Sequence, residues 1–264
     1  MRTDTMTVAR LLATRVLGAC AGLAFAATAA SAAGEAPEIK RQAWSFSGVT
    51  GLYDKAQLQR GFQVYKEVCS ACHAMHQLSY RNLVEIGLSE EQARRIAAEF
   101  QVKDGPNDEG EMFERPARLS DRFRSPFPNP QAARAANNGA YPPDLSVMVK
   151  ARPNGADYMY ALLTGYRDPP PGFAMGDGMN YNAYFPGHQI AMPNVLNDGQ
   201  VEFADGTQAT VSQMARDVTT FMAWAAEPEL EQRRQMGVRI ILFLVILAGL
   251  TYAVKRKVWA DVKH

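Results

Sequence analysis

The stretch AQLQRGFQVYKEVCSACH, residues 56–73, decides the fold, because it joins a predicted helix to a pair of neighbouring cysteines. Apolar residues recur in its first half at helical spacing and predict one buried face. In its second half, Cys69 and Cys72 are separated by two residues, and His73 follows directly. The helix therefore delivers two thiols and an imidazole to one place. Its apolar face consists of Leu58, Phe62 and Tyr65.

The N-terminus has the three parts of a secretory signal peptide. Three arginines precede a short apolar run, residues 16–27, and the small-residue sequence Ala-Ser-Ala ends at Ala32. The run is shorter than the roughly 20 residues that a membrane-spanning helix needs. We expect residues 1–32 to be a signal peptide, cleaved after Ala32 or the neighbouring Ala33, and residues 33–235 to form an exported domain.

A second apolar run, residues 236–254, predicts a C-terminal transmembrane helix. At 1.5 Å per residue it is about 28 Å long, close to the thickness of the hydrocarbon core. The tail 255–264 begins with three basic residues, but other basic residues lie at the start of the apolar run. The distribution of charge alone therefore favours a cytoplasmic tail only mildly. Together with the signal peptide, this predicts a single-pass protein of the bacterial inner (cytoplasmic) membrane, with its exported domain in the periplasm.

The two cysteines of the motif admit four interpretations. The third cysteine, Cys20, lies in the predicted signal peptide, so no framework of structural disulfides is available. A redox pair belongs in a βαβ context that is lacking here, zinc needs four ligands, and a disulfide across two residues adds little stability. C-x-x-C-H is the attachment motif of c-type haem. The predicted cofactor is one covalently attached haem (heme c), held by Cys69 and Cys72, with His73 on the iron.

Residue spacing leaves the second axial ligand of that iron open. Methionine is the usual partner of a histidine-bound haem in electron transfer. Met192 stands out, because it lies in FPGHQIAMPNVL, residues 185–196, a loop that two prolines stiffen. Periodicity does not separate it from Met175 or Met179, and His188 is geometrically possible. Most of the downstream methionines are expected to fill the core; besides these three they are Met112, Met148, Met159, Met214 and Met222.

Four further stretches resemble the cytochrome c1 family, closest to its bacterial type. They are RAANNGAYPPDLS (134–146), ADYMYALLTGYRDPPPGF (156–173), NYNAYFPGHQIAMP (180–193) and DGTQATVSQMARDVTTFMAWAAEPE (205–229). The resemblance extends from about Trp44 to the C-terminus. It implies a mainly α protein, with a cytochrome c-type haem fold, long loop insertions and one C-terminal transmembrane helix.

The resemblance also assigns roles to single residues. It implies that Met192 is the sixth iron ligand, opposite His73. Arg152 matches the position whose guanidinium meets a haem propionate, a pairing that suits its planar shape. The remaining matches are haem-pocket positions: Asn137, Pro142, Pro143, Tyr158, Leu163 and Phe185.

The function that the resemblance implies is electron relay in ubiquinol–cytochrome c reductase, in respiratory or photosynthetic electron transport. The chain would pass single electrons from a Rieske iron–sulfur protein to a basic soluble cytochrome c, beside a cytochrome b subunit and without a catalytic site of its own. The alternatives are a haem subunit of a terminal oxidase, and a haem enzyme or gas sensor with an open sixth iron site.

The charge of the chain is balanced overall and uneven locally. The formal net charge is +1 and no long basic run occurs, so nucleic acid is not an expected partner. Residues 85–114 hold nine acidic residues against three basic ones. Such a run is most often a solvated surface, but here it follows the haem motif and could dock a basic cytochrome c.

Local signals complete the expected fold. Thr210 and Gln213 form the pattern of a capping box and predict the start of a helix. Proline, glycine and asparagine are dense in residues 115–153 and 168–193, which we expect to be ordered loops wrapped over the cofactor rather than separate domains.

Overall fold

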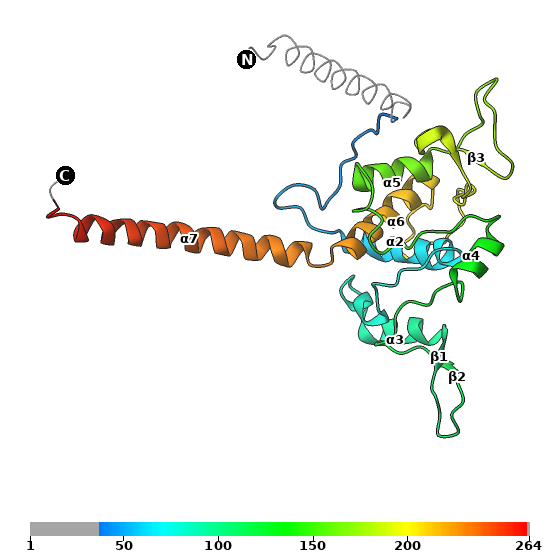
Figure 1. Cartoon of the computed structure of the whole chain (residues 1–264), viewed down its shortest axis with the longest axis horizontal. Helices are drawn as coiled ribbons and strands as arrows, with labels where there is room; N and C mark the ends of the chain where they lie inside the picture. The colour runs from blue at the N-terminus through cyan, green and yellow to red at the C-terminus, as the bar shows by residue number, and fades with distance from the viewer. Residues whose placement is uncertain (1–36, 263–264) are drawn as a thin grey trace, which may run out of the picture.

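The computed structural model of the chain describes residues 37–262, so the predicted signal peptide and its cleavage site lie outside the described residues. Figure 1 shows a head of short helices and loops from which one long helix, α7, extends. The helices are α2 (Lys55–Glu67), α3 (Glu90–Ala98), α4 (Pro130–Ala136), α5 (Gly155–Thr164), α6 (Val211–Ala226) and α7 (Leu230–Val258). This architecture confirms the predicted mainly α class with one C-terminal apolar helix.

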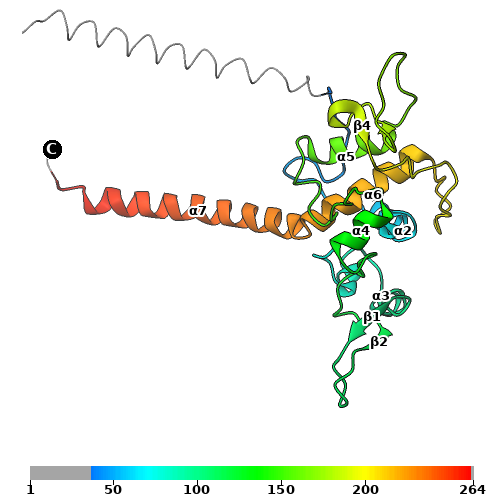
Figure 2. The same cartoon turned by 45° about the vertical axis from the view of Figure 1, so that its right-hand side comes forward.

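Extended structure in the described residues is limited to two small antiparallel pairs. Strands β1 (Gln101–Asp104) and β2 (Phe113–Pro116) form a hairpin, with Gln101 opposite Pro116. Strands β3 (Asn180–Tyr181) and β4 (Gln189–Ile190) form the second pair. Figures 1 and 2 both show the β1–β2 hairpin projecting from the head, well apart from β3 and β4. The two predicted loop regions are thus largely irregular, with α4 and these short strands inside or beside them.

Helix α2 forms as the sequence predicts and ends just before the cysteine motif. The side chain of Asp54 caps its first turn by accepting from the backbone N–H groups of Ala56 and Gln57, at 2.9 and 3.1 Å. The predicted apolar face is buried, and the chain then tightens into a 3-10 turn, Cys69–Ala71. The helix therefore holds the motif against the core by its buried face.

Helices α2 and α6 pack directly on each other and form the centre of the core. The rings of Phe62 and Phe221 lie 5.6 Å apart between centroids, and Trp224 is also buried. Helix α6 begins as predicted, since the hydroxyl of Thr210 accepts from the backbone N–H of Gln213 at 3.1 Å. The reciprocal half of the expected capping box is not formed, because the backbone N–H of Thr210 donates to the carbonyl of Gln208 instead, at 3.0 Å. The Gln213 amide donates to Asp217 at 2.9 Å.

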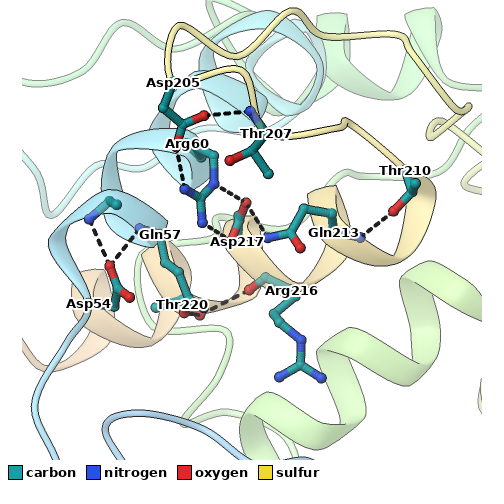
Figure 3. Close-up of polar contacts among 11 residues, drawn as sticks. Asp54, Gln57, Arg60, Asp205, Thr207, Thr210, Gln213, Arg216, Asp217 and Thr220 are labelled. Carbon is teal, nitrogen blue, oxygen red and sulfur yellow. Dashed lines mark hydrogen bonds and ion pairs between the residues drawn. The ribbon is translucent and has the colours of Figure 1, made fainter.

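A buried ion pair joins the same two helices (Figure 3). Arg60 of α2 donates to Asp217 of α6 at 2.7 Å, and the Asp217 side chain is fully buried. The other arm of Arg60 reaches Asp205 in the loop before α6, at 2.6 Å. One guanidinium therefore ties the motif-bearing helix to α6 and to the loop that precedes it.

Helix α7 is the one helix described between residues 37 and 262 that is long and apolar enough to cross a membrane, with a mean hydropathy of 2.2 over its most apolar window. It is longer than the predicted span, because it begins at Leu230 rather than Met236. The extra turns contact the head. Arg234 donates to the carbonyl of Phe46 at 3.0 Å, and Glu231 accepts from the backbone N–H of Tyr53 at 2.8 Å.

Candidate functional site

The two cysteines lie in the 3-10 turn that follows α2. The backbone N–H groups of Cys72 and His73 both donate to the carbonyl of Cys69, at 3.1 and 2.9 Å, which brings the three residues onto one tight turn. The thiol of Cys69 packs against the core, whereas Cys72 is exposed. Burial, with a smaller contribution from Cys72, raises the pKa of Cys69 to about 12.

The ring of His73 is oriented by a carbonyl 70 residues further along the chain. Its Nδ1 lies 2.8 Å from the carbonyl oxygen of Pro143. A carbonyl can only accept, so Nδ1 carries the proton and Nε2 is the nitrogen left for a metal. Burial lowers the pKa of His73 and outweighs the opposing influence of Pro143 and Asp144. The ring is therefore neutral at pH 7, as an iron-binding imidazole must be.

A cavity of about 680 Å³ opens beside the motif, within the range of cofactor sites. Of the predicted site residues, Cys72 and Pro142 line it. A second part of the wall is the proline-rich segment 123–130, which lies in the loop region 115–153 that the sequence predicts to wrap over the cofactor. Pro126, Pro128 and Pro130 stiffen this segment. The base of the β1–β2 hairpin completes the wall, with Lys103 and Glu114.

The other predicted pocket residues come from α4, α5 and the loops beside them. Tyr158 and Leu163 lie in α5 and are buried. Arg152 is exposed just before α5, close enough to Tyr158 that its charge opposes the rise in the tyrosine pKa that burial causes. Asn137 ends α4 and donates to the carbonyl of Ala133 at 2.7 Å. Their joint contact with a haem stays a prediction, as does that of Phe185, which packs on the edge of the core.

The structure reduces the number of candidate methionine ligands. Met148, Met159, Met214 and Met222 are buried in the core, as expected, whereas Met112 is exposed near the hairpin. Met175, Met179 and Met192 are half-buried, and of these three Met192 packs against the core. The hydroxyl of Tyr166 donates to the Met192 carbonyl at 3.0 Å and holds the loop in place. Pairing of Met192 with His73 across an iron stays a prediction.

Residues 44–262 match the Cytochrome C1 family. The chain belongs to the cytochrome c1 family. It is 53% identical over 245 residues to "Cytochrome c1-2, heme protein, mitochondrial" of Solanum tuberosum, covering 92% of this chain and 94% of that one. It is 45% identical over 261 residues to cytochrome c1 of Rhodospirillum rubrum, covering 92% and 96%. A third relative, "Cytochrome b/c1" of Bradyrhizobium diazoefficiens, is 49% identical over 83% of this chain but only 35% of its own length.

Membership of the cytochrome c1 family confirms the resemblance drawn from the four sequence stretches. Several mitochondrial relatives are named heme proteins, in agreement with the predicted cofactor. The residues present fit a c-type haem on independent grounds. The turn presents two free thiols two residues apart, Nε2 of the following imidazole has no hydrogen-bond partner within residues 37–262, and Cys72 lines a cavity beside the turn.

Proposed function

We propose that this chain is the membrane-anchored, haem-bearing electron carrier of a ubiquinol–cytochrome c reductase. It accepts single electrons from a Rieske iron–sulfur protein and passes them to a soluble cytochrome c. The observation that carries the proposal is the neutral, oriented imidazole of His73 beside Cys69 and Cys72, in a chain of the cytochrome c1 family.

The residues of the chain hold and tune the cofactor. Haem supplies the one-electron redox chemistry when bound. Cys69 and Cys72 would attach it, Nε2 of His73 and the thioether of Met192 would bind its iron, and a methionine ligand would raise the potential relative to a second histidine. Arg152 would bind a propionate. No proton transfer is needed, so the chain requires no general acid or base of its own.

The partner cytochrome b is supported by the Bradyrhizobium relative. That protein is named cytochrome b/c1 and is much longer than the region similar to this chain. A single polypeptide that carries both names supports a complex in which the two proteins lie together. In that complex α7 packs beside the helices of cytochrome b. The helix anchors the chain in the bacterial inner membrane, and the predicted signal peptide places the head in the periplasm.

The acceptor side is supported by the position of the acidic β1–β2 hairpin. Asp108, Glu109 and Glu111 are exposed between its strands, and within the described residues none of them is in an ion pair. The hairpin base lines the same cavity as Cys72, which supports a docking role for this acidic loop on the side of the haem attachment. Such charge steers a basic cytochrome c toward that edge without requiring a large contact.

Purification of the intact chain from its own membranes tests this function. We expect a covalently bound haem with a c-type spectrum, co-purification with a dihaem cytochrome b and a Rieske protein, and no carbon monoxide binding in the reduced state. Rapid carbon monoxide binding would support the gas-sensor or enzyme alternative instead. Co-purification with a copper-containing oxidase core would support the oxidase alternative.

A further inference from the structure

The loop that carries Pro143 is anchored by one carboxylate, that of Asp144. One of its oxygens accepts from the backbone N–H of His76 at 2.9 Å and from the His76 ring. The other accepts from the backbone N–H of Ser146 at 2.8 Å. Burial raises the pKa of Asp144, but the donors from Ser146 and His76 outweigh it, so the pKa lies below its usual value. The group is therefore an anionic acceptor at pH 7.

Two more hydrogen bonds run between the same segments. The backbone N–H of Leu145 donates to the carbonyl of Ala74 at 2.9 Å, and that of Gln77 donates to the hydroxyl of Ser146 at 3.0 Å. Ser146 is fully buried. Residues 74–77, directly after the haem motif, are thus joined to residues 144–146, directly after the carbonyl that orients His73.

The third segment joined at this point is the proline-rich wall of the cavity. The far nitrogen of the His76 ring, Nε2, lies 2.7 Å from the hydroxyl of Ser125. The imidazole of His76 therefore connects Asp144 to the wall, although its place next to the motif suggested no role for it in the sequence. Serine, histidine and aspartate are lined up here to hold three loops together.

We propose that Asp144 is a positioning residue for the axial histidine. The carbonyl of Pro143 and the N–H of Asp144 belong to one planar peptide unit, so the orientation of the carbonyl follows from where the Cα of Asp144 is held. The proline ring already fixes the preceding φ angle. With the Asp144 side chain tied to residues 76 and 146, the carbonyl points at Nδ1 of His73. The proposal rests on the proposed haem function.

This position makes Asp144 a determinant of the redox potential. A strong acceptor at Nδ1 makes the opposite nitrogen a better electron donor to iron, which favours the oxidised state. Replacing Asp144 by asparagine leaves one amide N–H facing a backbone N–H, so the loop shifts and the bond to His73 weakens. Loss of the negative charge acts in the same direction. Both effects raise the midpoint potential.

Three full-length, haem-loaded variants test the proposal by redox titration, thermal unfolding and the paramagnetically shifted proton resonances of His73. Asp144→Asn should raise the midpoint potential, shift these resonances and lower Tm. Asp144→Glu keeps the charge, but its side chain is one methylene longer and cannot hold the loop in the same place. If Asp144 acts by positioning, this variant should shift the His73 resonances too. The matched control is Asp198→Asn, because Asp198 also accepts a backbone N–H from a distant residue, Val211, at 2.6 Å. It should lower Tm alone.

The outcomes separate the possible explanations. If Asp144→Asn changes the potential no more than Asp198→Asn does, the proposal is wrong. If Asp144→Asn changes it while Asp144→Glu matches the unaltered protein in every readout, the residue acts by charge alone and positioning is wrong. Should Asp144→Asn fail to accumulate, Ser146→Ala takes its place, because it removes the bond from Gln77 that joins the two segments. It should shift the His73 resonances relative to those of the unaltered protein, and unchanged resonances would contradict the proposal. Absence of covalent haem from the unaltered protein would refute the proposed function itself.

Discussion

Gly61 of α2 lies directly against the backbone of Asp217 in α6, so closely that a Cβ atom on Gly61 would overlap the Asp217 carbonyl. The contact occurs where the helix that carries the haem motif crosses the helix that precedes the membrane anchor. A backbone carbonyl cannot rotate away as a side chain can, so only glycine permits the two helices to approach this closely.

We therefore expect Gly61→Ala to destabilise the head by at least about 1–3 kcal/mol, the usual cost of overpacking. For a domain of this size that lowers Tm by roughly 2–4 °C for each kcal/mol. The control is Gly237→Ala, also within a helix but with open space around the added methyl group. Calorimetry on both haem-loaded variants checks the difference. Equal Tm values for the Gly61→Ala and Gly237→Ala variants would mean that α2 and α6 can move apart at little cost.

Asp205 gives the stability of the head a specific pH dependence. The backbone N–H of Thr207 and the Arg60 guanidinium lower the pKa of Asp205 to about 2 (Figure 3). Because the folded pKa lies below the unfolded value of roughly 3.9, the carboxylate stabilises the fold above that value. The Tm advantage of the unaltered chain over Asp205→Asn should be full at pH 7 and shrink between about pH 4 and 2. An advantage that stays constant down to pH 2 would contradict this assignment.

The first turns of α7 belong to the head. Leu230 is buried, and both Glu231 and Arg234 bind the chain segment that precedes α2. A soluble fragment ending at Glu229 would lose these contacts, whereas one ending at Gln235 keeps them. We expect both to retain haem, with the longer fragment more stable by a few kcal/mol, since each lost hydrogen bond costs about 1 kcal/mol. Identical urea midpoints would show that the extra turns contribute nothing.

Met192→Leu tests the sixth iron ligand. Leucine has nearly the same volume, so folding and covalent haem attachment should survive. Loss of the thioether should abolish the far-red sulfur–iron absorption band and lower the potential sharply. Met179→Leu is the matched control, since Met179 is half-buried in the preceding loop. If the band is lost in the control and persists in Met192→Leu, the ligand is Met179.

The hairpin carboxylates are expected to set the rate of electron delivery. Combined Asp108→Asn, Glu109→Gln and Glu111→Gln should slow reduction of a basic cytochrome c at low salt and flatten the salt dependence, because the Debye length falls to roughly 8 Å at 0.15 M salt. The haem spectrum should not change. The control is Asp168→Asn with Asp177→Asn, two exposed residues in the segment between α5 and β3. Figures 1 and 2 show this segment far from the hairpin. An equal effect per charge in both variants would assign the result to net charge.

The amino-acid sequence by itself determined the features that depend on neighbours along the chain. Helical spacing was enough for the buried face of α2, a capping residue for the start of α6, and an apolar run for α7. The spacing of Cys69, Cys72 and His73 was enough to predict the cofactor, because both thiols must reach the same porphyrin edge.

Only the tertiary structure decided how these parts are held. The proton on His73 is placed by Pro143, 70 residues away, and Arg60 finds Asp217 across 157 residues. Spacing carries no information about such pairs, since they depend on the path of the intervening loops. The same holds for Asp144, which the sequence presents as an ordinary loop aspartate and the fold places between the haem motif and the carbonyl that orients its histidine.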